Sequence, residues 1–237
     1  SAVSREQTGG PASSREYIPK HSQVVASKVD EPLVVPSTGS TLIDETFESS
    51  GFTENSWTVV NDATNVWVVG QAESFSGTSS AYISNNGGTS ASYTNTIAAT
   101  SHFYKDFTLP DGANTLTFDW KCEAENAAGA TQYDYGAVVI TDTTTTPVAG
   151  TEVITTLATA GVNGRLGAAT NLGKFNLGYG TSPGTVWNTE TIDLSSYSGS
   201  TKRLVFTWQD DTSVGVNPPF IVDNIKITNA GGDTLIY

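Results

Sequence analysis

Hydrophobic and polar residues alternate most regularly between Arg203 and Thr228, in the sequence RLVFTWQDDTSVGVNPPFIVDNIKIT. A period of two is what a half-buried strand requires, because successive side chains point to opposite faces. The pattern predicts two strands joined into a hairpin by a loop of turn-forming residues. In the second strand, Asp223 shares a face with three isoleucines. A carboxylate there must be paired, hydrogen-bonded or bound to a metal, because an isolated buried charge is too costly.

The same alternation predicts strands along the rest of the chain. They cover residues 43–47, 57–60, 66–69, 81–84, 103–109, 116–120, 135–141 and 187–194, with an edge strand at 151–157. The segments LTFDW (116–120) and LVFTW (204–208) share one pattern, so we expect both to face a common apolar interior. Residues 158–182 contain six glycines and predict a long irregular loop. Many short strands with polar turns are typical of a β-sandwich or barrel.

The first 40 residues differ in composition from the rest. They are rich in serine, proline and glycine, and their four basic side chains balance four acidic ones. The sequence therefore predicts an extended N-terminal arm, residues 1–40, and a single β-domain, residues 41–237. Apolar patches at 17–18, 24–25 and 33–35 predict that the arm docks on its own body or on a neighbouring subunit, for example as an added strand. The C-terminal DTLIY, residues 233–237, is also expected to pair with a strand or another chain.

The formal net charge of −13 restricts the partners. A chain this acidic is a poor candidate for nucleic acid or for an anionic membrane surface, since both attract lysine and arginine. No apolar run approaches the roughly 20 residues that a bilayer-spanning helix needs. The acidity suits solubility and also suits cation binding. Cys122 is the single cysteine, so no intramolecular disulfide can form, and we interpret it as a small strand residue.

Five segments taken together resemble the jelly-roll adhesin modules of Bacteroidetes surface proteins. These are the cleaved-adhesin and choice-of-anchor J families, which are related to MAM domains and to carbohydrate-binding jelly rolls. The segments are FESSGFTENSW (47–57), GTSSAYIS (77–84), LTFDWKCEAE (116–125), YDYGAVVIT (133–141) and LVFTWQDDTSVGVNPPFIVDNIKI (204–227). The resemblance covers residues 42–228 and excludes the arm. It implies an all-β, two-sheet antiparallel jelly-roll β-sandwich without catalytic activity, used for adhesion, glycan contact or assembly.

Domains of this kind often hold a structural Ca²⁺ ion between their first and last strands. The resemblance implies Glu48 and Asp223 as its ligands, with Ser79 or Ser80 as weaker candidates. Ca²⁺ takes six to eight oxygen ligands, and carboxylates far apart in sequence would join the two ends of the domain. The alternative is that Asp223 caps backbone amides and Glu48 is solvated.

Glycan contact would need exposed aromatic rings beside polar side chains. The candidates are Trp67, Tyr93, Tyr104, Tyr179 and Trp187. Each of these rings has core or edge packing as its alternative role, because aromatic side chains contribute most of the burial in such a fold.

A glycoside hydrolase is the less favoured alternative. It would need two carboxylates about 5–10 Å apart. The pairs Asp210–Asp211 and Glu123–Glu125 are interpreted as solvated turn residues, and the strand signature E-x-D-x-E is absent. The two histidines belong to no recognisable nucleophile motif. The sequence therefore predicts no enzyme.

These observations predict a non-enzymatic module displayed on a surface or a particle. Its arm would fix it to a protein partner or to another copy of the chain, and its body would contact cell-surface glycans. Two settings remain open. One is an extracellular bacterial adhesin whose signal peptide has been removed. The other is a phage virion protein or the subunit of an extracellular filament.

Overall fold

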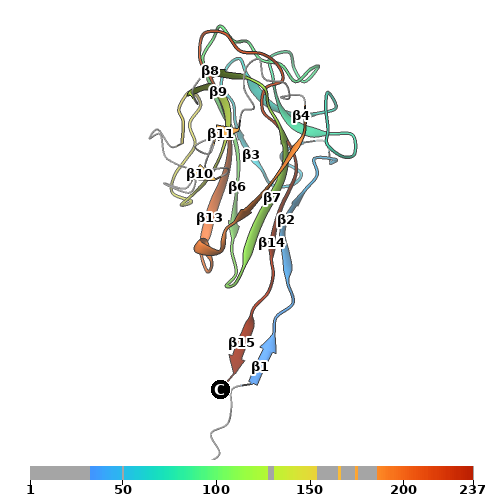
Figure 1. Ribbon diagram of the computed structural model, residues 1–237, viewed down its shortest axis with the longest axis vertical. Coiled ribbons are helices and arrows are strands. Elements are labelled where there is room, and N and C mark those ends of the chain that lie inside the picture. The colour runs from blue at the N-terminus through green and yellow to red at the C-terminus, as the bar shows by residue number, and fades with distance from the viewer. Residues whose placement is uncertain are drawn as a thin grey trace, which may run out of the picture.

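The computed structural model describes residues 33–49, 51–127, 131–153, 165–166, 174–175 and 186–236. These residues form two antiparallel sheets that pack face to face, and a separate two-stranded ribbon (Figure 1). The predicted all-β, two-sheet antiparallel jelly-roll sandwich is therefore confirmed. The described part of the chain contains no helix with the length and hydropathy that crossing a membrane requires.

The first sheet has seven strands. They are β3 (Thr58–Val60), β6 (Ala99–Thr108), β8 (Glu125–Ala127), β9 (Thr131–Thr141), β10 (Arg165–Leu166), β11 (Lys174–Phe175) and β13 (Thr201–Asp210). The order across the sheet is β10-β9-β13-β6-β3, and both β8 and β11 also pair with β9. β13 pairs with β6 over its whole length, so it lies at the centre of the sheet.

The second sheet has six strands. They are β2 (Ser40–Glu45), β4 (Val66–Gly70), β5 (Ser80–Ser84), β7 (Asn114–Lys121), β12 (Asn188–Asp193) and β14 (Ile221–Asn229). The order is β12-β7-β14-β5-β4. One edge of β14 pairs with β7, while the other pairs first with β5 and then with β2. A short 3-10 turn, Ser195–Tyr197, follows β12.

The predicted hairpin between β13 and β14 is wrong, although both strands exist. β13 pairs with β6 and β9 in the first sheet, whereas β14 pairs with β2, β5 and β7 in the second. The connecting loop, residues 211–220, thus carries the chain from one sheet to the other. Alternation predicts a strand but not its neighbour, because any extended segment of matching pattern can form the ladder.

The core lies between the sheets and is dominated by aromatic rings. Phe118 on β7 meets Phe206 on β13 with ring centroids 5.4 Å apart, so the LTFDW and LVFTW strands face each other across one interior, as predicted. Phe103 on β6 stacks on Phe206 at 4.8 Å and lies edge-to-face with Trp67 at 4.7 Å. Such rings bury about 150–250 Å² each and supply much of the hydrophobic stabilisation.

The predicted face of Asp223 is also wrong. Val222, Ile225 and Ile227 belong to the hydrophobic core. Asp223 directly follows Val222 and so lies on the other face of β14, where its side chain is nevertheless buried. The register between β14 and β7 shifts between Asp223 and Lys226, and Asn224 there has a left-handed φ of 50°. This β-bulge inserts one extra residue, so that Asp223 points away from the core that Ile225 enters.

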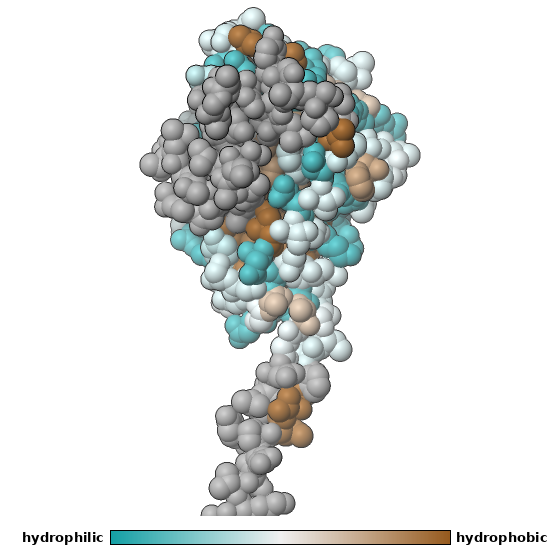
Figure 2. All heavy atoms as spheres, in the orientation of Figure 1, coloured by the Kyte–Doolittle hydropathy of each residue, from teal (hydrophilic) through white to brown (hydrophobic). Residues whose placement is uncertain are grey.

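A two-stranded ribbon extends away from the sandwich (Figure 1). β1 (Leu33–Pro36) pairs antiparallel with β15 (Asp233–Ile236), from Leu33↔Ile236 to Pro36↔Asp233. Figure 2 shows the hydrophobic side chains of β1 on this extension.

The predictions that patch 33–35 adds a strand and that the C-terminal segment pairs with one are confirmed. Patches 17–18 and 24–25, and most of the loop 158–182, lie outside the described residues. Of the predicted edge strand 151–157, the described residues form only a bridge between Val148 and Thr151.

Candidate functional site

A pair of aromatic rings lies at the surface of the second sheet. Phe75 comes from the loop between β4 and β5, and its side chain is 49% exposed. Trp187 directly precedes β12 and is half-buried. The two rings meet edge-to-face, with centroids 5.7 Å apart. We call Phe75 and Trp187 the aromatic pair. An exposed phenylalanine held in place by a second ring offers apolar contact surface to a ligand rather than to the core.

Polar side chains on the outward face of the second sheet adjoin the aromatic pair. Asp119 on β7 accepts hydrogen bonds from the hydroxyl of Thr189 and, at 2.8 Å, from the side-chain amide of Asn224. Register explains the grouping, since Asp119 lies opposite both Thr189 and Asp223. The backbone N–H of Phe75 donates to Asp223 Oδ2 at 2.9 Å, which ties the aromatic pair to this polar row.

An ion pair stands on the same face. The ammonium group of Lys121 on β7 donates to the carboxylate of Glu73, which belongs to the loop that carries Phe75. The outward face thus combines carboxylates, an amide, a hydroxyl and an ammonium group beside two aromatic rings. Sugar hydroxyls both donate and accept hydrogen bonds, and their C–H faces pack on aromatic rings, so this combination suits a carbohydrate.

The structure brings the predicted calcium residues to one loop. Glu48 Oε1 accepts hydrogen bonds from the backbone N–H groups of Thr78 and Ser79 at 2.9 and 2.8 Å, and Oε2 accepts one from the Thr78 hydroxyl. These bonds, led by the Thr78 amide, lower the pKa of the exposed Glu48. The Ser79 hydroxyl lies 3.5 Å from that of Thr78.

Asp223 caps the other side of the same loop. Its Oδ2 accepts from the N–H groups of Phe75 and Ser76 at 2.9 and 3.1 Å, and its Oδ1 accepts from Asn224 N–H. Burial nevertheless raises the pKa of Asp223. A carboxylate offers about four acceptor positions. Three bonds to each group leave little room for a cation, and a Ca²⁺ ion here would compete with the N–H donors.

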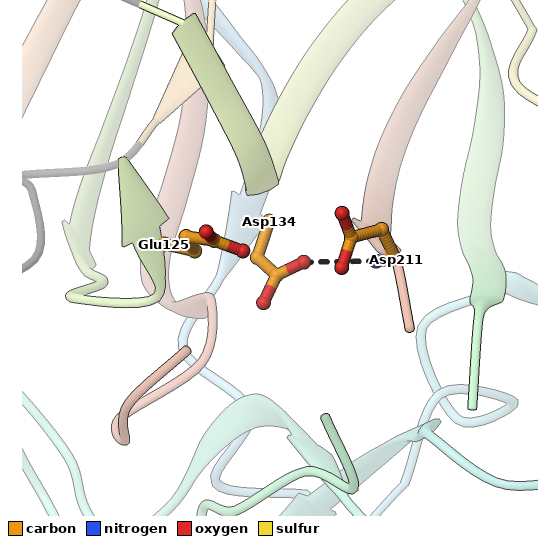
Figure 3. A group of neighbouring side chains, drawn as sticks. All are labelled: Glu125, Asp134 and Asp211. Carbon is orange, nitrogen blue, oxygen red and sulfur yellow. Dashed lines mark hydrogen bonds between the residues drawn. The ribbon is translucent and has the colours of Figure 1, made fainter. Parts of the chain in front are cut away.

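A second group of carboxylates lies at the end of the first sheet (Figure 3). Glu125 begins β8, Asp134 lies opposite it on β9, and Asp211 follows the last residue of β13. One oxygen from each lies within 4.8 Å of the others, and the described residues contain no other group of three or more potential metal-ligating side chains. Burial and mutual repulsion raise the pKa of Glu125 and Asp134. We call these three residues the acidic cluster.

Hydrogen bonds hold the acidic cluster in place. The Tyr93 hydroxyl donates to Asp134 Oδ2 at 2.6 Å, and the backbone N–H of Asp211 donates to Asp134 Oδ1 at 2.8 Å. The neighbouring Asp210 is 3% exposed and accepts from Trp208 Nε1 at 2.6 Å and Asn65 Nδ2 at 3.0 Å. The interpretation of Asp210–Asp211 and Glu123–Glu125 as solvated turn residues is therefore wrong for Asp210 and Glu125, which are buried, whereas their partners Asp211 and Glu123 are partly exposed and lie outside the strands.

The predicted glycan residues fall into different environments. Trp67 is 2% exposed and donates from Nε1 to the Ser101 carbonyl, so it is a core residue and offers no ring to a ligand. Tyr93 is likewise buried, and Tyr104 lies beneath the Arg203 guanidinium at 4.3 Å. Tyr179 lies outside the described residues. Only Trp187 among the five is placed in the aromatic pair.

Sequence reasoning missed Phe75 and the acidic cluster. The signal for Phe75 is present, because a phenylalanine in the serine-rich loop QAESFSGTSS has no alternating partners to share a core face. The acidic cluster has no local signal. Its members come together only through the pairing of β8 with β9 and of β9 with β13.

No family model and no curated protein matches this chain. Among solved structures, it is similar to the K1 cleaved adhesin domain of Lys-gingipain from Porphyromonas gingivalis, at 19% identity over 83% of this chain and 100% of that one, with a TM-score of 0.44. It is similar to the xylan-binding domain CBM22-1 of Paenibacillus barcinonensis Xyn10C, at 13% identity over 84% and 99%, with a TM-score of 0.44. It is also similar to the enzymatically active domain of tailspike protein 4 from bacteriophage CBA120, at 10% identity over 81% and 21%, with a TM-score of 0.41. Cleaved adhesin domains and carbohydrate-binding modules, which the sequence motifs resemble, are thus among the solved structures similar to this chain.

Proposed function

We propose that this protein is a non-catalytic adhesion module that binds a neutral glycan on the outward face of its second sheet. The observation that carries the proposal is the aromatic pair Phe75–Trp187 beside the polar row of Asp119, Thr189 and Asn224. One sugar ring would pack on the exposed Phe75, while its hydroxyl groups would bond to the polar row. The module would act outside the cell, where such glycans are displayed.

The charges favour a neutral ligand over an acidic one. Asp119, Asp223 and Glu73 all lie in the segments that carry or adjoin the aromatic pair, although Asp119 and Asp223 are buried, and the cation Lys121 is already paired with Glu73. The chain as a whole carries a formal charge of −13. A uronate or sialylated glycan would be repelled both locally and at longer range, so uncharged hexose or pentose polymers fit best.

Phe75→Ala and Trp187→Ala are each expected to weaken glycan binding at least about tenfold, which corresponds to roughly 1.4 kcal/mol. The reason is loss of the ring that a sugar would stack on, or of the ring that holds it in place. The measurement is retardation of the full chain in native gels containing soluble xylan, galactan or β-glucan, with polygalacturonate as the acidic comparison.

Tyr133→Ala is the matched control, because Tyr133 is an exposed aromatic residue, 44% accessible, on the first sheet. It should bind as the unmodified chain does. Binding that is lost equally in all three variants, or that prefers polygalacturonate, would contradict this site. Release of reducing ends from any of the polymers would contradict the non-catalytic role.

An assembly role for residues 1–40 is the second candidate function. The ribbon favours it, since β1 belongs to the arm and stands clear of the sandwich (Figure 1). The arm would fix the module to a neighbouring subunit, on a bacterial surface, a phage virion or an extracellular filament. Removal of residues 1–40 should then abolish assembly and leave the sandwich folded, because the core begins at Ile43.

A structural Ca²⁺ ion at Glu48, Asp223 and Ser79 stays a prediction. If they hold one, Ca²⁺ will raise the melting temperature of the full chain and EDTA will lower it, because a ligand that binds only the folded state stabilises it. Glu48→Gln should remove the response. A response that persists in Glu48→Gln but disappears in Glu125→Gln would assign the ion to the acidic cluster instead. A melting temperature unaffected by EDTA would remove calcium from both places.

A further inference from the structure

The loop between β4 and β5, residues 71–79, carries the exposed ring of Phe75, and we call it the Phe75 loop. Outside the sheet ladders, the described part of the chain shows no backbone-to-backbone hydrogen bond that involves this loop. Phe75 is 49% exposed, so burial does little to fix its ring. The position of the ring therefore depends on the side chains that hold the loop backbone.

Asp223 holds the first half of the Phe75 loop. Its Oδ2 accepts hydrogen bonds from the backbone N–H groups of Phe75 and Ser76 at 2.9 and 3.1 Å. The Ser76 hydroxyl also donates to Asn224 Oδ1 at 3.0 Å, and Asn224 belongs to the polar row of the proposed glycan site. Asp223 and Asn224 both lie on β14, the middle strand of the second sheet. The backbone of Phe75 is thus anchored to the sheet on which the glycan would lie.

Glu48 holds the second half of the Phe75 loop. Its Oε1 accepts hydrogen bonds from the backbone N–H groups of Thr78 and Ser79 at 2.9 and 2.8 Å, and its Oε2 accepts one from the Thr78 hydroxyl at 2.8 Å. Gly77 has a left-handed φ of 65°, and a Cβ at this position would lie 2.5 Å from Glu48 Oε1. Glycine therefore permits both the backbone turn and the close approach of the carboxylate.

The bonds that Glu48 makes need an acceptor oxygen rather than a negative charge. A backbone N–H group can donate to a carboxylate or to the oxygen of a side-chain amide. A Ca²⁺ site, in contrast, depends on the number of charged ligands that surround the ion. An uncharged side chain of the same shape therefore distinguishes a Glu48 that holds the loop from a Glu48 that holds a cation.

We infer that Glu48 is a positioning residue of the glycan site, which together with Asp223 holds the Phe75 loop by its N–H groups and so keeps the Phe75 ring in place before the glycan arrives. In this role Glu48 touches no sugar and acts through Phe75. A loop that is already ordered reduces the free-energy cost of binding, so glycan affinity depends on these bonds. The inference rests on the proposed function, and it competes with the structural Ca²⁺ ion that the resemblance implies at Glu48.

Glu48→Ala and Glu48→Gln in the full chain test this inference. Glu48→Ala removes all three bonds and should weaken binding to xylan, galactan or β-glucan about three- to tenfold in native gels, because the loop must then be ordered on binding. Glu48→Gln should recover most of that affinity. Its Oε1 still accepts from both N–H groups, and its amide can donate to the Thr78 hydroxyl. EDTA should leave the affinity of the unmodified chain unchanged.

Glu54→Ala is the matched control. Glu54 is an exposed carboxylate whose side chain accepts a hydrogen bond from the neighbouring Thr53 hydroxyl. The substitution changes the charge, and hence the mobility in the gel, as Glu48→Ala does, but it should bind glycan as the unmodified chain does. The melting temperatures of all three variants should stay close to that of the unmodified chain, because neither glutamate belongs to the core.

Amide hydrogen exchange measured without glycan gives a second readout. Glu48→Ala should speed exchange at Thr78 and Ser79, whose acceptor is lost. It should also speed exchange at Phe75 and Ser76, although Asp223 still accepts from them, because the two halves of the loop are held together. Glu48→Gln should keep the slow exchange at all four amides.

The outcomes separate this inference from the proposed function on which it rests. Affinity lost equally in Glu48→Ala and Glu48→Gln, or lost by the unmodified chain in EDTA, would overturn the inference in favour of a cation. Full affinity in Glu48→Ala, or unchanged exchange at Phe75, would also overturn it, and a loss of binding in Phe75→Ala would then show that the glycan site itself stands. An unmodified chain that binds none of the polymers would overturn both.

Discussion

Replacing Phe103 with alanine is expected to lower the free energy of unfolding by about 3–5 kcal/mol, the usual range for a large aromatic residue removed from a packed core. Phe103 is fully buried at the centre of the aromatic core. Its ring stacks on Phe206 at 4.8 Å and meets Trp67 and Trp57 edge-to-face at 4.7 and 5.2 Å. Rigid rings on all sides cannot collapse into the space that the substitution leaves. Urea denaturation followed by tryptophan fluorescence measures the change.

Phe75→Ala is the matched control for this substitution. It removes the same ring from a position that is 49% exposed, where Trp187 is the one described aromatic ring that it contacts. We expect its effect on stability to stay below about 1 kcal/mol, as for surface positions generally. A loss of similar size at both positions would mean that the core between the two sheets is not the main source of stability.

Individual strands were predictable because alternation records burial directly. Leu204, Phe206 and Trp208 are all fully buried in β13, and the same pattern found β7 on the facing sheet. Which strands pair was not predictable, because the ladder is made by backbone groups that are the same in every strand. The wrong hairpin between β13 and β14 follows from that limit.

The site was predictable only in part, for two physical reasons. A single left-handed residue, Asn224, turned Asp223 to the outward face, and nothing in the alternating pattern of β14 marks such a bulge. The acidic cluster needs three strands in register, so Glu125, Asp134 and Asp211 cannot be grouped from their positions in the sequence. The sequence predicts Trp187 as a ligand-binding aromatic within a strand, residues 187–194, whereas β12 begins one residue later at Asn188 and leaves the Trp187 ring half-buried beside Phe75.

The second large effect that we expect concerns pH and Asp210. Burial raises the pKa of this carboxyl from 3.8 to about 8, against the opposing effect of hydrogen bonds from Asn65 and Trp208. The unfolded chain therefore releases this proton near pH 3.8 and the folded chain near pH 8. Between these values the folded state binds more protons, so stability should fall as pH rises, by up to roughly 1.4 kcal/mol per pH unit for one such group. The raised pKa values of Asp134 and Glu125 act in the same direction.

Asp210→Asn should therefore flatten the fall in stability between about pH 5 and pH 8, because the amide cannot ionise. Urea unfolding of both proteins across this range gives the free energy of unfolding at each pH. The comparison is between the slopes of the two curves against pH, because the amide also alters the bonds to Asn65 and Trp208 and so shifts the whole curve.

Asp193→Asn is the control. Hydrogen bonds from the Ser195 side chain and N–H lower the pKa of Asp193, so its contribution is lost only as pH falls below about 4 and its removal should leave the neutral range unchanged. Equal slopes in the unmodified chain and in Asp210→Asn would show that Asp210 is already ionised in the folded protein, with Trp208 and Asn65 stabilising the carboxylate.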